Sequence, residues 1–257
     1  MHCELLPAAV LVATAMFLAV PRAVAQAPGA VPAPAAAATT PSALVPTARD
    51  DKGGSEREQE LLRRAREGGP AKVVFVGDSI TQGWEGAGSQ VWRERFAPLG
   101  AMNLGNSGDR TEHVLWRLQQ APLTRLQPAH IVLMIGTNNL GHGRSTAADT
   151  LAGVEAIVKL LREQCASAVV HVLEIFPRGE TINAMRGDIC QVNQGLRAFV
   201  RAASAAKPGE ARLRIHAVGD VFVDADGRID KAIMPDFLHL SAQGYGMWGE
   251  ALAPLLK

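Results

Sequence analysis

The hydrophobic and polar positions along the chain alternate between two patterns. Strands are predicted at 72–76, 101–103, 130–134, 169–175 and 213–217, and those at 72–76, 130–134 and 169–175 are mostly apolar, as is typical of buried strands. Segments with helical spacing lie at 91–96, 111–119, 151–161, 192–203 and from Ala242 onward, and a charged helix at 55–67 precedes the first strand. Strands that alternate with helices pair in parallel and are covered on both faces. The pattern predicts one α/β domain over residues 55–257.

The first 54 residues do not share this pattern. Residues 5–20 are almost wholly apolar and are followed by Ala-Val-Ala at 23–25, which predicts a cleaved signal peptide over 1–25 and a periplasmic or secreted protein. The first four residues contain no Lys or Arg, so an uncleaved anchor stays open as an alternative. Residues 26–54 are rich in Ala and Pro, which predicts a disordered linker without chemistry of its own.

The composition excludes some classes of function. The net charge is +1 and the basic residues are dispersed, which argues against nucleic acid as a partner. Once the signal is removed, Cys165 and Cys190 remain, and we expect two separate buried thiols, with a disulfide as the open alternative. The histidines at 113, 130, 142, 171 and 216 lack metal-ligand spacing, and Asp-Ala-Asp-Gly at 224–227 is expected to be a turn, so no metal site is predicted.

The first candidate for chemistry is the stretch VVFVGDSITQGW at 73–84. Its buried strand delivers Ser79 to the carboxyl edge of the sheet, where open α/β folds place their sites. A turn in which Asp78 or Ser79 only caps a helix is the alternative. Near the C-terminus, Asp236 and His239 stand three residues apart, so the carboxylate can fix the tautomer of an imidazole that takes a proton from Ser79.

Two further stretches follow strands and carry hydrogen-bond donors. Asn-Leu-Gly-Asn-Ser-Gly-Asp at 103–109 includes Gly108, whose N–H a close backbone approach can aim at a substrate. Gly-Thr-Asn-Asn at 136–139 includes the amide of Asn138, although an ordinary turn explains this composition as well. Asp109, with Glu112 three residues later, is interpreted as the N-cap of a capping box and is left out of the catalytic residues.

These four blocks, in this order, resemble those of the SGNH (GDSL-type) hydrolases. Residues 91–118, Phe-Pro-Arg-Gly at 176–179 and 236–240 are also similar to the catalytic subunits of intracellular platelet-activating-factor acetylhydrolase. The resemblance implies a flavodoxin-like three-layer α/β/α sandwich with a central parallel five-stranded sheet, and serine ester hydrolysis without a cofactor. It implies Ser79 as nucleophile, His239 as base and Asp236 as its orienter, with an oxyanion hole of the Ser79 N–H, the Gly108 N–H and the Asn138 side chain.

The neighbours of these residues indicate the substrate. Ile80, Thr137 and Leu238 adjoin them in sequence and would form a stiff, narrow acyl wall. Only residues 81–90 lie between Ile80 and the next helix, which leaves little material for a lid. We therefore expect a secreted esterase for short, acetyl-type esters. Carbohydrate O-deacetylase is the main alternative, and thioesterase, lysophospholipase and a non-catalytic binding domain are more distant ones.

The remaining expectations concern partners and packing. The predicted partner is a small-molecule ester, with no stable membrane insertion after signal cleavage, and a homodimer stays open. The tryptophans at 84, 92, 116 and 248 are expected to pack the domain, although Trp84 is close enough to Ser79 for another role. Arg178 is expected in a surface ion pair, with an anionic substrate as the alternative.

Overall fold

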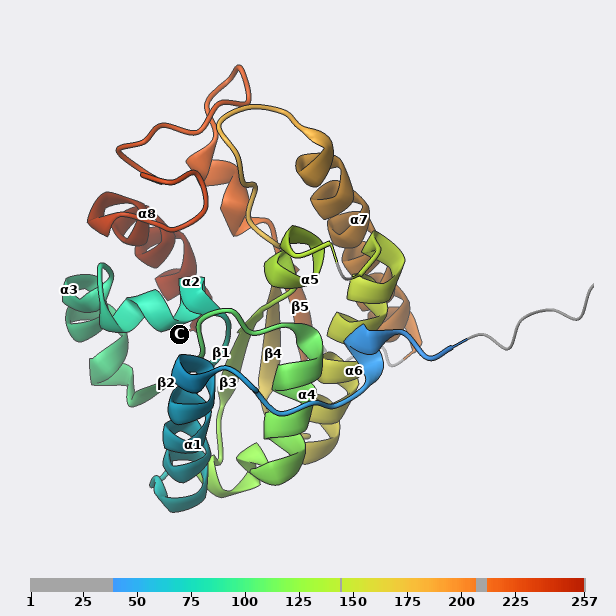
Figure 1. Cartoon of the computed structure of the whole chain (residues 1–257). Helices are drawn as coiled ribbons and strands as arrows, with labels where there is room; N and C mark the ends of the chain where they lie inside the picture. The colour runs from blue at the N-terminus through green and yellow to red at the C-terminus, as the bar shows by residue number, and fades with distance from the viewer. Residues whose placement is uncertain (1–38, 144, 207–211, 257) are drawn as a thin grey trace, which may run out of the picture. The chain divides into compact units, whose positions relative to one another are not determined.

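The computed structural model describes residues 39–143, 145–206 and 212–256, so the predicted signal peptide lies outside the described residues (Figure 1). All five strands are present close to their expected positions: β1 (Val73–Gly77), β2 (Ala101–Gly105), β3 (His130–Met134), β4 (Val169–Leu173) and β5 (Leu213–His216). The α-helices are α1 (Lys52–Glu67), α2 (Ser79–Gln82), α3 (Ser89–Val91), α4 (Thr111–Gln120), α5 (Thr137–Gly141), α6 (Ala147–Gln164), α7 (Ala184–Ala206) and α8 (Ala242–Leu252).

The strands form one parallel sheet in the order β2-β1-β3-β4-β5. This is the strand order of the flavodoxin-like fold, whose direction of winding reverses between β1 and β3. In the paired register, Gly77 at the end of β1 lies opposite Gly105 of β2 and Met134 of β3. The chain segments that follow these three strands therefore leave the sheet at the same edge.

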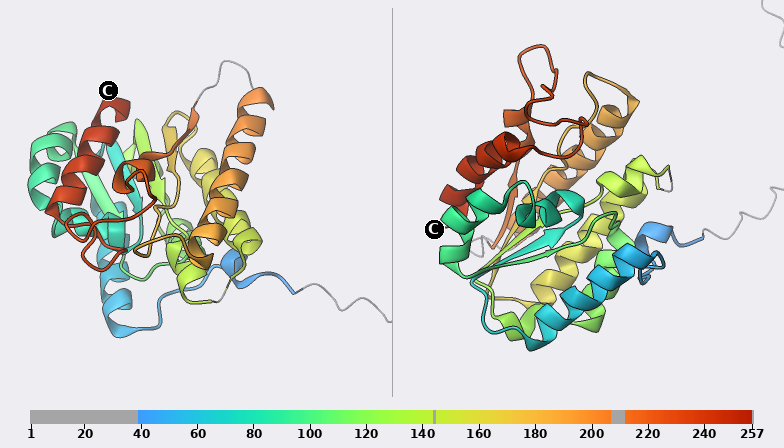
Figure 2. Two further views of the ribbon diagram at one scale, coloured as in Figure 1. Left: turned by 90° about the horizontal axis from the view of Figure 1, so that it is seen from above. Right: turned by 60° about the vertical axis from the view of Figure 1, so that its left-hand side comes forward.

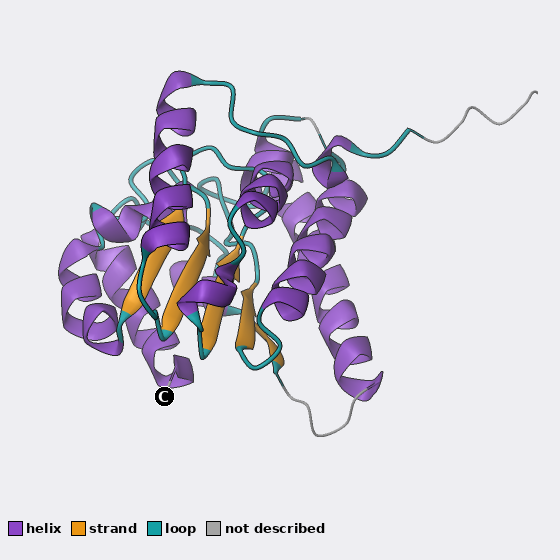
Figure 3. Ribbon diagram, turned by 90° about the horizontal axis from the view of Figure 1, so that it is seen from below, coloured by secondary structure: helices purple, strands orange, loops and turns teal. Residues whose placement is uncertain are grey.

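Helices cover both faces of the sheet, as the alternating pattern predicts (Figures 2 and 3). Because successive strand residues point to opposite faces, Val74 and Val76 pack with apolar residues of α1, α4, α6 and α7. Val73 and Phe75 point the other way, into a second core with α8. The expected three-layer α/β/α sandwich is confirmed. No helix in the described ranges is long and apolar enough to cross a membrane.

The ordered domain begins earlier than the boundary expected at residue 55. A short 3₁₀ helix, η1 (Ser42–Leu44), places Ala43 in a fully buried position, where its carbonyl accepts a hydrogen bond from Thr111 Oγ1 at 2.9 Å. Asp51 caps α1 by accepting from the Gly54 N–H at 2.8 Å. Segment 39–54 is thus held to the domain at Ala43 and leads into α1, although its composition is that of a linker.

Two smaller differences concern helices and thiols. The helix expected at 192–203 starts at Ala184, and that expected at 91–96 is α3 followed by the π-helical turn η3 (Trp92–Phe96). Cys165 is buried and Cys190 is exposed, and both are free thiols. The two separate thiols are confirmed and the disulfide alternative is wrong, but the expected burial is wrong for Cys190.

Three histidines on neighbouring strands form a hydrogen-bonded row that the sequence analysis did not identify. His130 Nδ1 lies 3.0 Å from His171 Nε2, and His171 Nδ1 lies 3.1 Å from His216 Nε2. His171 is fully buried, and this burial lowers its pKa to about 3, assisted by the neighbouring imidazoles and Arg214. Burial also lowers the pKa of His130 and of His216.

This row makes the fold sensitive to acid. His171 remains neutral in the folded protein down to about pH 3, whereas an unfolded chain protonates it below about pH 6.5. Since the unfolded state then binds more protons, we expect His171 to lower the free energy of unfolding by about 1–2 kcal/mol as the pH falls from 6.5 to 5. Urea unfolding of the wild type and of His171→Gln at both pH values measures this contribution. The comparison is needed because Asp78, whose pKa burial raises to about 7, has the opposite pH dependence. An identical loss of stability in both proteins would contradict the assignment.

Candidate active site

Ser79 stands at the junction between β1 and α2, as expected. Gly77 is required there because a Cβ atom would lie 2.2 Å from Thr81 Oγ1 and 2.4 Å from the Met134 carbonyl oxygen. Asp78, which is 1% exposed, caps α2 by accepting from the Ile80 N–H at 3.0 Å. Burial is the main reason that the pKa of Asp78 is raised to about 7. The tight junction leaves Ser79 as the first residue of α2.

His239 and Asp236 meet Ser79 from the loop that precedes α8. His239 Nε2 lies 2.9 Å from Ser79 Oγ, and His239 Nδ1 lies 2.7 Å from Asp236 Oδ2. The other carboxylate oxygen of Asp236 accepts from the N–H groups of Leu238 at 3.0 Å and His239 at 2.7 Å. Partial burial acts to raise the pKa of Asp236, but these hydrogen bonds outweigh it and the pKa is lowered. The carboxylate is therefore ionised and fixed behind the ring.

Gly108 lies in a tight turn after β2. The Asp109 N–H donates to the Asn106 carbonyl at 3.1 Å, and Gly108 has φ +77°, the combination that a turn with glycine at its third position needs. Asn138, in α5, donates from Nδ2 to the Asp109 carbonyl at 2.9 Å. This hydrogen bond joins the turn after β3 to the turn after β2. Within the described residues, the N–H groups of Ser79 and Gly108 donate to no other protein group.

The interpretation of Asp109 as an N-cap is wrong. Helix α4 is capped by Arg110, whose N–H donates to His113 Nδ1 at 3.1 Å. The Asp109 carboxylate is instead completely buried between two guanidinium groups, with Arg49 at 2.9 Å and Arg117 at 2.6 Å. Sequence reasoning missed Arg49 because it lies in the segment expected to be a linker.

An open depression of about 450 Å³ surrounds the exposed Ser79–His239 pair, and its lining comprises Ser79, Gln82, Gly83, Glu85, Gly86, Ser107 and His239. The three expected acyl-wall residues do not line it. Ile80 and Thr137 are 2% and 3% exposed, and Leu238 is half-buried. The acyl wall expected of these residues therefore stays a prediction.

Two further residues lie near the site, Trp84 and Arg178. Trp84 is fully buried among aromatic rings, with ring centroids 4.7 Å from both Tyr245 and Trp248, so it packs the domain. Arg178, expected in a surface ion pair, is half-buried and donates from Nη1 to the carbonyl and Oγ1 of Thr137, each at 3.3 Å. Desolvation by burial lowers the pKa of Arg178.

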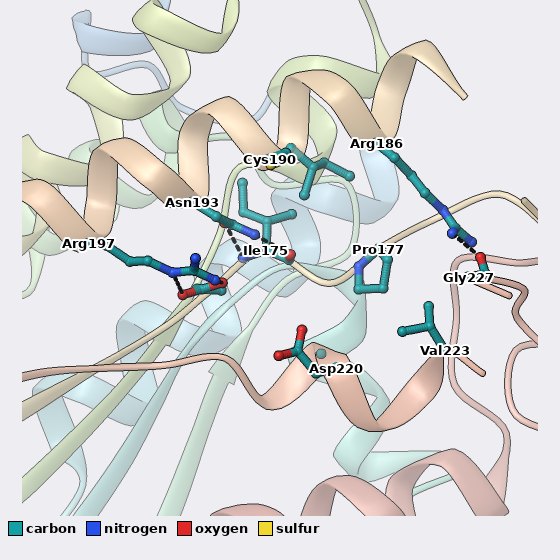
Figure 4. A pocket seen from close by; sticks show the side chains of 12 residues that line it. Ile175, Pro177, Arg186, Cys190, Asn193, Arg197, Asp220, Val223 and Gly227 are labelled. Carbon is teal, nitrogen blue, oxygen red and sulfur yellow. Dashed lines mark hydrogen bonds and ion pairs between the residues drawn. The ribbon is translucent and has the colours of Figure 1, made fainter. Parts of the chain in front are cut away.

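A separate cavity of about 260 Å³ lies between α7 and the loop after β4 (Figure 4). Its two arginines have partners within the protein: Arg197 forms a two-pronged ion pair with Glu174, at 2.5 and 2.6 Å, and Arg186 donates to backbone carbonyls. Asp220 also lines the cavity. None of the residues around Ser79 lines it. Among the described residues there is no group of histidine, cysteine and carboxylate side chains that could hold a metal ion.

Comparisons with known proteins identify the family of this chain. Residues 75–247 match the family model described as the GDSL-like Lipase/Acylhydrolase family. Platelet-activating factor acetylhydrolase IB subunit alpha1 of Homo sapiens is 42% identical over 185 residues, which cover 72% of this chain and 75% of that protein. The alpha2 subunit of Rattus norvegicus is 37% identical over 207 residues, or 79% and 85% of the two chains.

Solved structures share the fold at lower identity. A GDSL-like lipase from Bacteroides thetaiotaomicron superposes with a TM-score of 0.62 at 19% identity, over 77% of this chain and 98% of that one. An acetylxylan esterase from Geobacillus stearothermophilus gives a TM-score of 0.56 at 16% identity, over 74% and 95%. The family match runs from within β1 to the middle of α8 and so contains Ser79, Gly108, Asn138, Asp236 and His239. The chain belongs to the GDSL-like lipase/acylhydrolase family, and it is a carboxylic ester hydrolase.

Proposed function

We propose that the protein is a serine esterase for short-chain carboxylic esters, with Ser79, His239 and Asp236 as its catalytic triad. The observation that carries the proposal is the unbroken row of contacts from Ser79 Oγ to His239 Nε2 and from His239 Nδ1 to Asp236 Oδ2, at 2.9 and 2.7 Å. This is the arrangement in which a serine hydroxyl loses its proton to an oriented imidazole.

The reaction follows from these contacts. Ser79 Oγ attacks the ester carbonyl carbon while His239 Nε2 takes its proton, and Asp236 stabilises the imidazolium that results. His239 then gives the proton to the leaving alcohol oxygen, which leaves an acyl group on Ser79. Water repeats the sequence and releases the acid. The N–H groups of Ser79 and Gly108 and the amide of Asn138 would stabilise the oxyanion, provided that Asn138 uses the amide hydrogen that does not bind Asp109.

Replacement of the triad tests this assignment. Ser79→Ala and His239→Ala should each remove nearly all hydrolysis of an aryl acetate, and the double variant should lose little more, because the residues act as one unit. Labelling by a fluorophosphonate should disappear in Ser79→Ala. The triad would be refuted if the fold loss of activity in the double variant equalled the product of the two single losses, or if labelling persisted without Ser79. An inert ester-binding domain would show no labelling of the wild type.

The preference for short acyl groups rests on how the two sides of Ser79 differ. Ile80 and Thr137 are almost fully buried, whereas the depression on the open side has room for a larger group. We expect the acyl group toward this buried side, near Leu238, which adjoins His239 in sequence, and the alcohol in the depression. The curated relatives are named acetylhydrolases, which supports an acetyl-type substrate.

We expect kcat/KM to fall steeply from acetyl to octanoyl esters of one common alcohol, because extra methylenes forced into a packed wall cost about 1–3 kcal/mol. Leu238→Ala should extend the range toward longer acyl chains. Faster turnover of the octanoyl ester by the wild type would contradict the short-acyl assignment and leave the triad intact. A parallel panel of acetylated sugars and acetylated lipids distinguishes the O-deacetylase alternative.

Export to the periplasm or medium is the second part of the proposal, and it rests on the apolar run at 5–20 and the small residues at 23–25. When the full chain is produced in a Gram-negative bacterium, mass spectrometry of the mature protein should find Gln26 at its N-terminus. An intact Met1 in the membrane fraction would instead indicate an uncleaved anchor.

A further inference from the structure

Arg49 reaches the site from outside the part of the chain that matches the family. It lies in the segment before α1, whereas the family match begins at residue 75. Its side chain is 9% exposed, and Nη1 donates to the Ser107 carbonyl at 2.6 Å and to Asp109 Oδ1 at 2.9 Å. The guanidinium therefore contacts the turn that carries Gly108 at two points.

The contact with Ser107 matters because of which peptide it involves. The Ser107 carbonyl and the Gly108 N–H belong to the same amide, and no peptide bond in the described chain is cis. In a trans amide the two groups point in opposite directions, so the Gly108 N–H is directed away from the guanidinium. A charged donor on the carbonyl oxygen also polarises the amide, and hydrogen bonds in such a row strengthen one another. Arg49 thus makes the Gly108 N–H a stronger donor and fixes its direction.

Other contacts hold the turn between Arg49 and Ser79. The Ser107 N–H donates to Gln82 Oε1, in the helix that Ser79 begins, at 2.7 Å. On the outer side, a Cβ atom added to Gly108 would stand 3.1 Å from Arg49 Nη2. The turn therefore lies between the guanidinium on one side and the helix of the nucleophile on the other.

We propose that Arg49 is a positioning residue of the oxyanion hole, which orients and polarises the Ser107–Gly108 peptide. The inference rests on the proposed esterase function and extends it to the segment before α1. If Arg49 had a purely structural role, its ion pairs would stabilise only the fold. In this proposal Arg49 also stabilises the transition state. Arg117 binds the same Asp109 carboxylate at 2.6 Å but has no contact with Ser107.

The test compares Arg49→Met with Arg66→Met in the full chain. Arg66 also donates to a backbone carbonyl, that of Gln120 at 3.0 Å, but it is exposed on α1. Loss of a whole oxyanion-hole donor costs about 10²–10³ in kcat, and Arg49 acts only through such a donor. We expect Arg49→Met to lower kcat for an aryl acetate by about 10-fold with KM nearly unchanged. Arg66→Met should retain wild-type kcat.

A second readout separates transition-state stabilisation from folding. A boronic acid adds to the serine oxygen as a tetrahedral anion, so its affinity should fall in Arg49→Met by the same factor as kcat/KM. In Arg49, Nη1 serves both Ser107 and Asp109, while Nε and Nη2 bind Asp51 and hold the guanidinium in place. Arg49→Lys keeps the charge but loses this second anchor, so it should show a smaller, several-fold loss. This variant carries the test if Arg49→Met does not fold.

Unchanged kcat in a folded Arg49 variant would overturn the inference, as would a kcat loss that boronic acid affinity does not follow. Ser79→Ala in the same assay distinguishes failure of the proposed esterase function from failure of the proposed role of Arg49. If that variant keeps its activity, the proposed function fails. If it is inactive while the Arg49 variants behave as wild type, only the role of Arg49 fails.

Discussion

The site depends on the register in which three parallel strands end together. Gly77 lies opposite both Gly105 and Met134, so β1, β2 and β3 release the chain at one edge of the sheet. The nucleophile's helix and the Gly108 turn follow directly, and Asn138 follows β3. A shift of one residue in either pairing would separate these groups and reverse the face to which each strand's side chains point. The hydrogen bonds between the strands, rather than those between the catalytic side chains, therefore bring Ser79, Gly108 and Asn138 together.

The charged groups of the site divide into an exposed and a buried set. His239 and Asp236 are about half exposed, which suits groups that exchange protons with substrate and water. Asp109 is completely buried and has a guanidinium on each carboxylate oxygen. Breaking one side of such a buried arrangement leaves a charge without compensation, which is costly. The buried set thus holds the Gly108 turn rigidly, while the exposed set carries out the proton transfers.

Much of the fold could be predicted from sequence because the signals are local. The five strands lie within a few residues of their expected positions, and the signal is strongest for β1, β3 and β4, whose mostly apolar sequences are typical of strands buried on both faces. Helices were predicted less well at their ends. Helix α7 begins at Ala184, in a stretch whose polar residues leave no strong periodic pattern before Val192. The linker boundary was misplaced because composition does not reveal that Ala43 fills a buried position.

For the site, the sequence by itself determined which residue types stand after which strands, and the motif order pointed to Ser79, Asp236 and His239. Only the tertiary structure decided that Asp109 binds Arg49 and Arg117 instead of capping a helix, and that three histidines on separate strands touch. The physical reason is the range of the interactions. Caps and strand ends involve neighbours in the chain, whereas an ion pair across 60 residues depends on how the sheet and its helices pack.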